Sequence, residues 1–125
     1  MKNILFIEDE NEIAELYKRG LTKAGFSVEV KADGKEGLQY ALEKHPDLII
    51  LDLVMPKLDG MTVMQKLREE GEWGKNVLIV LFTNYDIARI KAERVIEGRP
   101  ASYLLKAENT PEEFTAKITA LLEKS

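Results

Sequence analysis

The chain has 125 residues, the length of one domain, with 18 Lys and Arg against 22 Asp and Glu. The net charge of −4 argues against a nucleic-acid-binding surface, which normally has a basic excess, and the absence of Cys excludes disulfides and thiolate chemistry. No run approaches the ~18 apolar residues of a membrane span, and the first run reaches Glu8 too soon for a signal peptide. We therefore expect a cytoplasmic single domain over residues 1–125.

Short apolar runs along the chain predict five strands. Three runs are continuous and each ends at a polar residue: 4–7 before Glu8, 48–51 before Asp52, and 77–82 before Thr83. Continuous runs of this length are typical of strands buried on both faces of a parallel sheet. Residues 27–30 and 102–105 are weaker candidates, and the alternating pattern of 27–30 indicates an edge strand.

Apolar residues recur at helical spacing after each predicted strand. The residues that mark these helices are Ile13, Leu16, Tyr17, Gly20 and Ala24; Leu38, Ala41 and Leu42; Met61, Met64 and Leu67; Ile87 and Ile90; and Phe114, Ile118, Leu121 and Leu122. Five strand–helix units in alternation predict an α/β, doubly wound parallel sheet with helices on both faces.

Glycines and a capping box indicate where the helices begin and end. Gly25, Gly71 and Gly98 stand where helices should stop. The Thr-Pro-Glu-Glu sequence at 110–113 is a capping box that begins the last helix. Gly20 lies inside the first helix, and we expect it to allow close packing of that helix on the sheet.

Charged and hydroxyl side chains follow the strands, at the sheet edge where doubly wound folds place their sites. Glu8 and Asp9 follow the first strand, Asp52 the third, Thr83 the fourth and Lys106 the fifth. Two carboxylates about 4 Å apart repel by roughly 4 kcal/mol at an effective dielectric of 20, so this cluster needs a cation. Oxygen ligands without His or Cys favour Mg²⁺ or Mn²⁺, which serve phosphoryl transfer. Asp52 is then a candidate nucleophile that forms an acyl phosphate.

The chain resembles the receiver domain of bacterial two-component response regulators over essentially its whole length. The matching motifs are Glu8-Asp9, the Asp-x-x-Met-Pro-x-x-Asp-Gly pattern at 52–60, Thr83, and the Tyr-Leu-Leu-Lys sequence at 103–106. The resemblance implies a flavodoxin-like (βα)5 three-layer sandwich, with a five-stranded parallel sheet in the order 2-1-3-4-5. Asp59 within this pattern is expected to be structural, as the N-cap of the third helix.

The resemblance also implies a metal site and a phosphodonor. Asp52 would accept a phosphoryl group from a phosphohistidine of a sensor histidine kinase or phosphotransfer protein. Mg²⁺ (or Mn²⁺) would be held directly by Asp9, mostly through water by Glu8, and by the Asp52 carboxylate and the Val54 backbone carbonyl.

The remaining residues are implied to sense the modification. Lys106 would pair with Asp52 and then with the phosphoryl oxygens, Thr83 would bond to the phosphoryl group, and Tyr103 would rotate inward. The protein would be a signalling switch rather than a turnover enzyme. Its expected partners are the phosphodonor and an unknown downstream protein, with a possible phosphorylation-linked homodimer and with no membrane or nucleic acid contacted.

Several positions depart from the family pattern. Ala107 stands where the family usually has a Pro with a cis peptide bond, so the Lys106–Ala107 bond should be trans or strained. Asn84 should narrow access to the phosphoryl site, and apolar Val54 with bulky Tyr85 should make dephosphorylation slow. Ala107 and Asn84 support the alternative of a degenerate receiver that binds a partner constitutively.

Other interpretations of the same residues are weaker. An FMN-binding flavodoxin lacks its phosphate loop here, an aspartate-based phosphatase lacks the second acid two residues after Asp52, and the P-loop motif is missing. Glu10 and Glu12 are interpreted as acids that favour the start of a helix. His45 is interpreted as a solvated residue at a helix end, not as a phosphotransfer histidine.

Overall fold

Five parallel strands form one sheet in the order β2-β1-β3-β4-β5, as predicted. The structure is a computed structural model, and it describes residues 1–55, 57–84, 95 and 97–124. The strands are β1 (Asn3–Ile7), β2 (Ser27–Lys31), β3 (Leu48–Leu51), β4 (Leu78–Thr83) and β5 (Ser102–Leu105). The chain passes from β2 over β1 to β3, so that β2 and β3 lie on opposite sides of β1, and the fold is the doubly wound class expected from the sequence.

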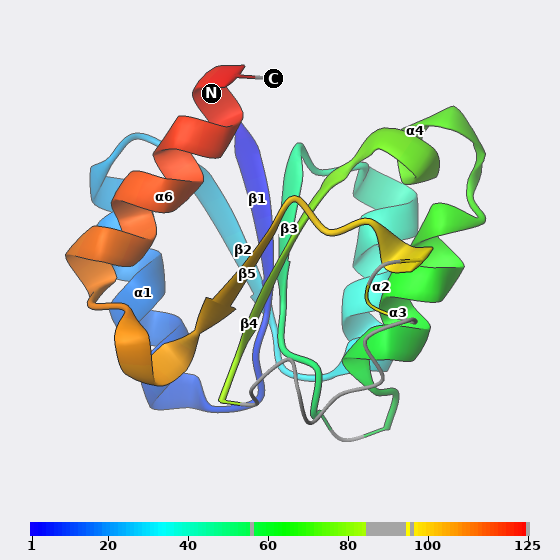
Figure 1. Cartoon of the computed structure of the whole chain (residues 1–125), viewed down its shortest axis with the longest axis horizontal. Helices are drawn as coiled ribbons and strands as arrows, with labels where there is room; N and C mark the ends of the chain where they lie inside the picture. The colour runs from blue at the N-terminus through cyan, green and yellow to red at the C-terminus, as the bar shows by residue number, and fades with distance from the viewer. Residues whose placement is uncertain (56, 85–94, 96, 125) are drawn as a thin grey trace.

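Helices cover both faces of the sheet and make three layers (Figure 1). They are α1 (Asn11–Lys23), α2 (Gly34–Lys44), α3 (Gly60–Arg68), α4 (Gly71–Asn76), the short 3₁₀ helix η2 (Lys106–Glu108) and α6 (Pro111–Lys124). Figure 1 places α1 and α6 on one face, and α2, α3 and α4 on the other. The helix predicted around Ile87 and Ile90 lies outside the described residues. Among the described residues, no helix is long and apolar enough to cross a membrane.

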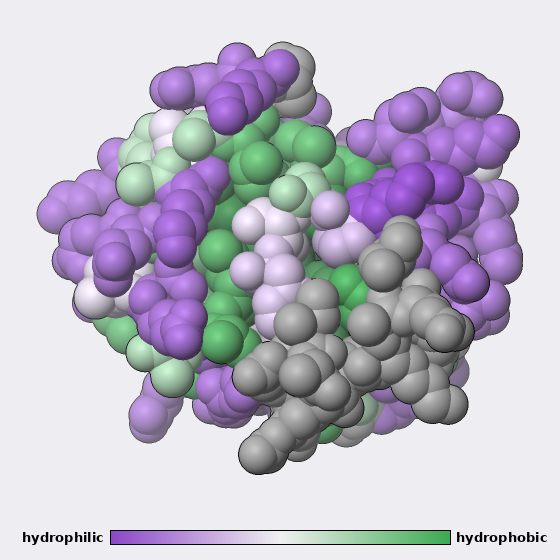
Figure 2. Space-filling model, in the orientation of Figure 1, coloured by the Kyte–Doolittle hydropathy of each residue, from purple (hydrophilic) through white to green (hydrophobic). Residues whose placement is uncertain are grey.

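The central strands are buried on both faces because consecutive side chains point to opposite sides of the sheet. In β1, Leu5 and Ile7 pack in the core on the α2–α3 side, while Ile4 and Phe6 pack in the core on the α1–α6 side. All four residues of β3 are fully buried in the same alternating way. The outer faces of the helices are hydrophilic, and a more apolar strip lies over the β5 edge of the sheet (Figure 2).

Local signals set the helix ends as predicted. The Asp59 carboxylate accepts a hydrogen bond from the Thr62 N–H at 2.9 Å, so Asp59 is the N-cap of α3. At the start of α6, the Glu113 N–H donates to the Thr110 hydroxyl at 3.1 Å and the Thr110 N–H donates to the Glu113 carboxylate at 3.0 Å. This reciprocal pair confirms the capping box. Gly25, with φ of 103°, follows the end of α1.

The prediction missed helix α4. Gly71 was expected only as a stop, and with φ of 62° it does follow α3, but a second helix of six residues begins there. The Trp73 ring of α4 stacks on His45 with centroids 4.2 Å apart, and its indole N–H donates to the Pro46 carbonyl at 3.2 Å. His45 is the exposed, left-handed C-cap of α2, as expected of a residue at a helix end.

Two expectations about α1 were wrong. A Cβ atom on Gly20 would lie 2.8 Å from the Thr115 hydroxyl oxygen, so this glycine allows α1 to approach α6 rather than the sheet. Leu16, expected on the apolar face, is 46% exposed, because the buried face of α1 is formed by Ala14, Tyr17 and Leu21.

Candidate functional site

The predicted site residues lie where β1, β3, β4 and β5 end, at the carboxyl edge of the sheet. This edge is at the bottom of Figure 1. The parallel register aligns Ile7 with Leu51, and Thr83 with Leu105. Residues that follow these positions in the chain are therefore delivered to one edge.

A compact ion cluster is the centre of this edge. The Lys106 Nζ lies 2.6 Å from Glu8 Oε1 and 2.9 Å from Asp52 Oδ2, and the three side chains are at most 8% exposed. The Asp52 contact is a hydrogen bond, and the Glu8 contact is a close ion pair. Lys106 Nζ also lies 5.8 Å from the centroid of the Phe82 ring, a cation–π distance. The sheet edge thus holds one cation between two buried carboxylates.

Burial changes the protonation of this cluster. Loss of solvent raises the pKa of Glu8 to about 7, although the neighbouring Lys106 ammonium acts in the opposite direction. Burial alone would lower the pKa of Lys106, but its contacts with Glu8 and Asp52 raise that pKa above the ordinary value. Lys106 therefore stays charged at neutral pH, while Glu8 is near its midpoint.

Three carboxylates after β1 form a group that fits a hard divalent cation. Oxygens of Glu8, Asp9 and Glu10 lie within 4.8 Å of one another, with Glu8 buried and the other two exposed. Glu8 is fully buried, and its Oε1 already lies beside the Lys106 ammonium. An all-oxygen donor set of this kind suits Mg²⁺. Asp52 is outside this group and meets Glu8 through the Lys106 ammonium.

Glu10 belongs to the site in a way that the sequence interpretation missed. It was assigned to the start of α1, but its side chain makes no capping bond there. Its N–H donates to Glu8 Oε2 at 3.2 Å, and its Oε1 lies 3.9 Å from Lys106 Nζ. The available signal was the run of three acids directly after a buried strand.

The other predicted residues flank the ion cluster. The Val54 N–H donates to Asp52 Oδ1 at 3.2 Å, which orients that carboxylate, and the Val54 side chain is 52% exposed. Thr83 is the fully buried last residue of β4. Tyr103 is half-buried in β5, in register with Leu81 of β4.

Two of the departures can be located. The Lys106–Ala107 peptide bond is trans, and Lys106 still reaches Asp52. Asn84 is exposed directly after Thr83. Tyr85, to which slow dephosphorylation was attributed, lies outside the described residues.

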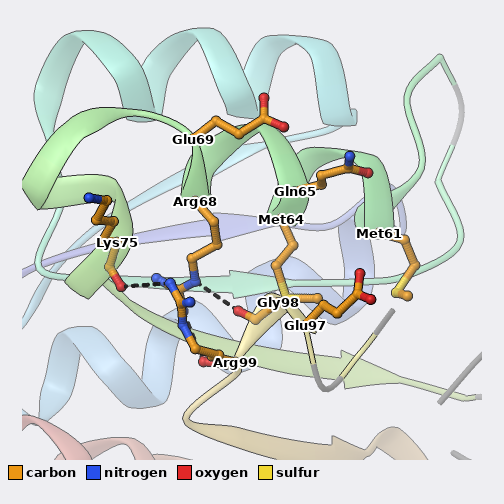
Figure 3. Close-up of a pocket in the computed structure, with 9 residues that line it drawn as sticks. All are labelled: Met61, Met64, Gln65, Arg68, Glu69, Lys75, Glu97, Gly98 and Arg99. Carbon is orange, nitrogen blue, oxygen red and sulfur yellow. Dashed lines mark hydrogen bonds between the residues drawn. The ribbon is translucent and has the colours of Figure 1, made fainter. Parts of the chain in front are cut away.

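A separate cavity of about 310 Å³ lies away from the charged edge, between α3 and the segment before β5 (Figure 3). Arg68 crosses it and donates hydrogen bonds to four backbone carbonyls, with lengths of 2.7–3.0 Å. The acceptors are Gly74, Val77, Gly98 and Arg99. Because this guanidinium is committed to the backbone, the carboxyl edge is the better candidate for chemistry.

Comparison with known proteins agrees with the fold. The sequence pattern of the response regulator receiver domain matches residues 4–119, so the chain belongs to this family. Members of the family act as signalling switches, generally not as turnover enzymes, and bind Mg²⁺ in an acidic pocket. The predicted family and fold class are confirmed.

Two relatives illustrate the match in sequence. The DNA-binding dual master transcriptional regulator RpaA of Synechocystis sp. is 35% identical over 125 residues, which cover 100% of this chain and 51% of that protein. The alkaline phosphatase synthesis transcriptional regulatory protein PhoP of Bacillus subtilis is 32% identical over 124 residues, covering 99% of this chain and 50% of that protein. The chain thus spans about half the length of these relatives.

Solved structures match over nearly the whole chain. The response regulator TrrA of Thermotoga maritima, in complex with Mg²⁺ and BeF, has a TM-score of 0.82 at 30% identity, covering 97% of this chain and 99% of that one. A CheY-like receiver domain from Methanospirillum hungatei has a TM-score of 0.88 at 22% identity, covering 99% and 95%, which shows the shared fold.

Proposed function

We propose that this domain is a phosphorylation-controlled switch that accepts a phosphoryl group on Asp52 in a Mg²⁺-dependent reaction. The observation that carries the proposal is the Asp52 carboxylate, held 2.9 Å from the Lys106 ammonium beside a group of three acids. A carboxylate that is buried, oriented and next to a cation is suited to attack phosphorus.

The reaction exchanges one bond to phosphorus for another. An Asp52 oxygen forms a bond to phosphorus as the bond to the donor's histidine nitrogen breaks, and the product is an acyl phosphate. Lys106 balances the charge on the transferred oxygens. Thr83, at the end of the adjacent strand, donates a hydrogen bond to the phosphoryl group, and Tyr103 changes orientation in response.

Glu8, Asp9, Asp52 and the Val54 backbone carbonyl would hold the metal. When bound, Mg²⁺ neutralises negative charge on the phosphoryl oxygens. The proximity of the Glu8 and Asp9 carboxylate oxygens supports this assignment. Glu10, exposed and near the same oxygens, would contribute negative charge at the rim.

The partners follow from this chemistry and from the family. A sensor histidine kinase or a phosphotransfer protein supplies the phosphoryl group in the cytoplasm, and a downstream protein, or a second copy of the domain, reads the change. RpaA is named a DNA-binding regulator, and about half of its length lies outside the match. The net charge of −4 on this domain argues against DNA contact by the domain itself.

Intact-mass measurement with a small phosphodonor and Mg²⁺ tests the proposal. The wild-type protein should gain one phosphoryl group, and chelation of the metal should prevent the gain. Asp52→Asn should abolish it. Asp59→Asn is the matched control, because Asn caps helix α3 as well as Asp does.

A wild-type protein that gains no mass, or an Asp52→Asn variant that gains as much as wild type, would contradict the proposal. Either result would favour the degenerate receiver that binds its partner constitutively.

A further inference from the structure

The turn that carries Lys106 contains an unexplained buried polar residue. β5 ends at Leu105, η2 follows, and the exposed fraction of Asn109 falls to 7% although Ala107 and Glu108 are exposed. η2 is a single 3₁₀ turn, the short form in which this helix type usually occurs. A polar side chain buried at its end needs hydrogen-bond partners.

Asn109 uses both ends of its side-chain amide. Its Nδ2 donates to the Leu105 carbonyl at 2.8 Å, and its Oδ1 accepts from the Lys117 ammonium of α6 at 2.6 Å. The ammonium can only donate and the carbonyl can only accept, so these partners fix the orientation of the amide. The Asn109 backbone carbonyl also accepts from the Tyr17 hydroxyl of α1 at 2.6 Å. Asn109 thus ties the end of β5 to α1 and α6.

These bonds act directly on the position of Lys106. Leu105 is the residue immediately before it, so the Asn109 amide closes the turn in which Lys106 stands. The Tyr17 ring meets Phe82 edge-on with centroids 4.9 Å apart, and Lys106 Nζ lies over the same Phe82 ring. Asn109 and Lys106 therefore contact the same pair of packed rings, Tyr17 and Phe82.

We propose that Asn109 is a positioning residue that holds Lys106 between Glu8 and Asp52. It closes the turn with a hydrogen bond to the Leu105 carbonyl and is itself held by Lys117 and Tyr17. The consequence for phosphorylation rests on the proposed function of Asp52, whereas the placement of Lys106 does not.

The chain offers a closely matched control. Asn76 Nδ2 also donates to the carbonyl four residues earlier, that of Glu72, at 2.8 Å, but on the surface of α4. Asn109→Ala is compared with Asn76→Ala. Asn109→Asp keeps an oxygen for Lys117 but puts a charged oxygen, which cannot donate, in place of the donor to Leu105. Lys117→Met removes the other contact.

The NMR signal of the Lys106 ε-methylene, assigned with Lys106→Met, reports its position without phosphorylation. Asn109→Ala and Asn109→Asp should move this signal toward those of the exposed lysines, while Asn76→Ala leaves it in place. Phosphorylation by a small phosphodonor at saturating Mg²⁺ should slow about tenfold in the two Asn109 variants. Mg²⁺ affinity, measured by calorimetry, should be unchanged or tighter, because a displaced ammonium no longer competes for the carboxylates.

The double variant with Lys106→Met separates positioning from general damage. Asn109→Ala should slow phosphorylation no further in that background. A wild-type Lys106 signal in Asn109→Ala would overturn the inference, as would weakened Mg²⁺ binding or an undiminished tenfold loss in the double variant. Failure of the proposed function has a different signature: wild-type protein that gains no phosphoryl group, whatever the Lys106 signal does.

Discussion

Two partly buried cations, Lys106 and Arg68, are held in opposite ways. Lys106 lies 2.6 and 2.9 Å from the carboxylates of Glu8 and Asp52. Among the described residues, Arg68 donates to four neutral backbone carbonyls, two of which belong to Gly98 and Arg99 before β5 (Figure 3). The first cation balances charge, and the second joins segments of the backbone.

The pKa values of the two cations shift in opposite directions for this reason. Burial and the neighbouring Arg99 charge lower the pKa of Arg68, while the carboxylate contacts overcome burial and raise that of Lys106. Backbone carbonyls do not titrate, bind a phosphoryl group or change their charge, so the electrostatic environment that they give Arg68 stays constant. The partners of Lys106 can be protonated, bound to a metal or phosphorylated. We therefore place the proposed chemistry at Lys106 and expect a structural role for Arg68.

The largest effect on stability is expected from Arg68. Arg68→Met leaves four carbonyls without their donor and should lower the free energy of unfolding by about 4 kcal/mol, measured by urea denaturation. Arg68→Lys should recover only part of this loss, because one ammonium cannot span four acceptors. Arg19→Met removes an exposed arginine of α1 and should change stability by no more than about 0.5 kcal/mol. Equal losses in the Arg68 and Arg19 variants would refute the architectural role.

The next largest effect is expected on the rate at Lys106. Lys106→Met should slow phosphorylation by a small phosphodonor about a hundredfold, because the cation no longer balances the developing charge. The same change should tighten Mg²⁺ binding, since the carboxylates lose a competing cation. Lys66 is exposed on α3, and Lys66→Met is the control that should leave both the rate and the Mg²⁺ affinity unchanged. Phosphorylation of Lys106→Met at the wild-type rate would show that this cation is structural.

A smaller, pH-dependent effect is expected from Glu8. Its pKa is about 7 in the folded protein and near 4.5 when unfolded, so the folded state binds more protons between these values. Stability of the metal-free protein should therefore fall by about 2 kcal/mol as pH rises from 5 to 7. Glu8→Gln should remove this contribution in chelator-treated samples. If wild type and Glu8→Gln keep parallel stability curves, the burial of Glu8 does not raise its pKa.

The sheet and its edge were predictable because each rests on a periodic signal. Continuous apolar runs ending at Glu8, Asp52 and Thr83 indicated strands buried on both faces, and parallel strands bring their ends together. The capping box at 110–113 was equally local. The meeting of Glu8, Asp52 and Lys106 at one edge followed from that fold, but the close ion pair between Lys106 and Glu8 was not predicted.

The roles of Arg68, Asn109 and Glu10 could not be predicted in this way. Arg68 and Asn109 bond to backbone carbonyls, which every residue possesses, so no residue pattern identifies their partners. The sequence favoured Glu10 as an acid at the start of a helix, and its distance of 3.9 Å from Lys106 shows that it also lies at the charged edge. Gly20 shows the same limit, since a glycine inside a helix indicates close packing but does not identify the element that packs against it.

The smallest effect is expected at Trp73. This is the chain's one tryptophan, and it lies in α4, at the opposite end of the sheet from the carboxyl edge (Figure 1). Its ring is held by stacking on His45 and by a hydrogen bond to the Pro46 carbonyl. Neither group belongs to the charged edge. Mg²⁺ binding should therefore leave Trp73 fluorescence essentially unchanged, while Arg68→Met, which frees the Gly74 carbonyl beside it, should change it. A large fluorescence change on Mg²⁺ binding to wild type would mean that the two ends of the sheet are coupled, and that Lys106 and Arg68 do not act separately.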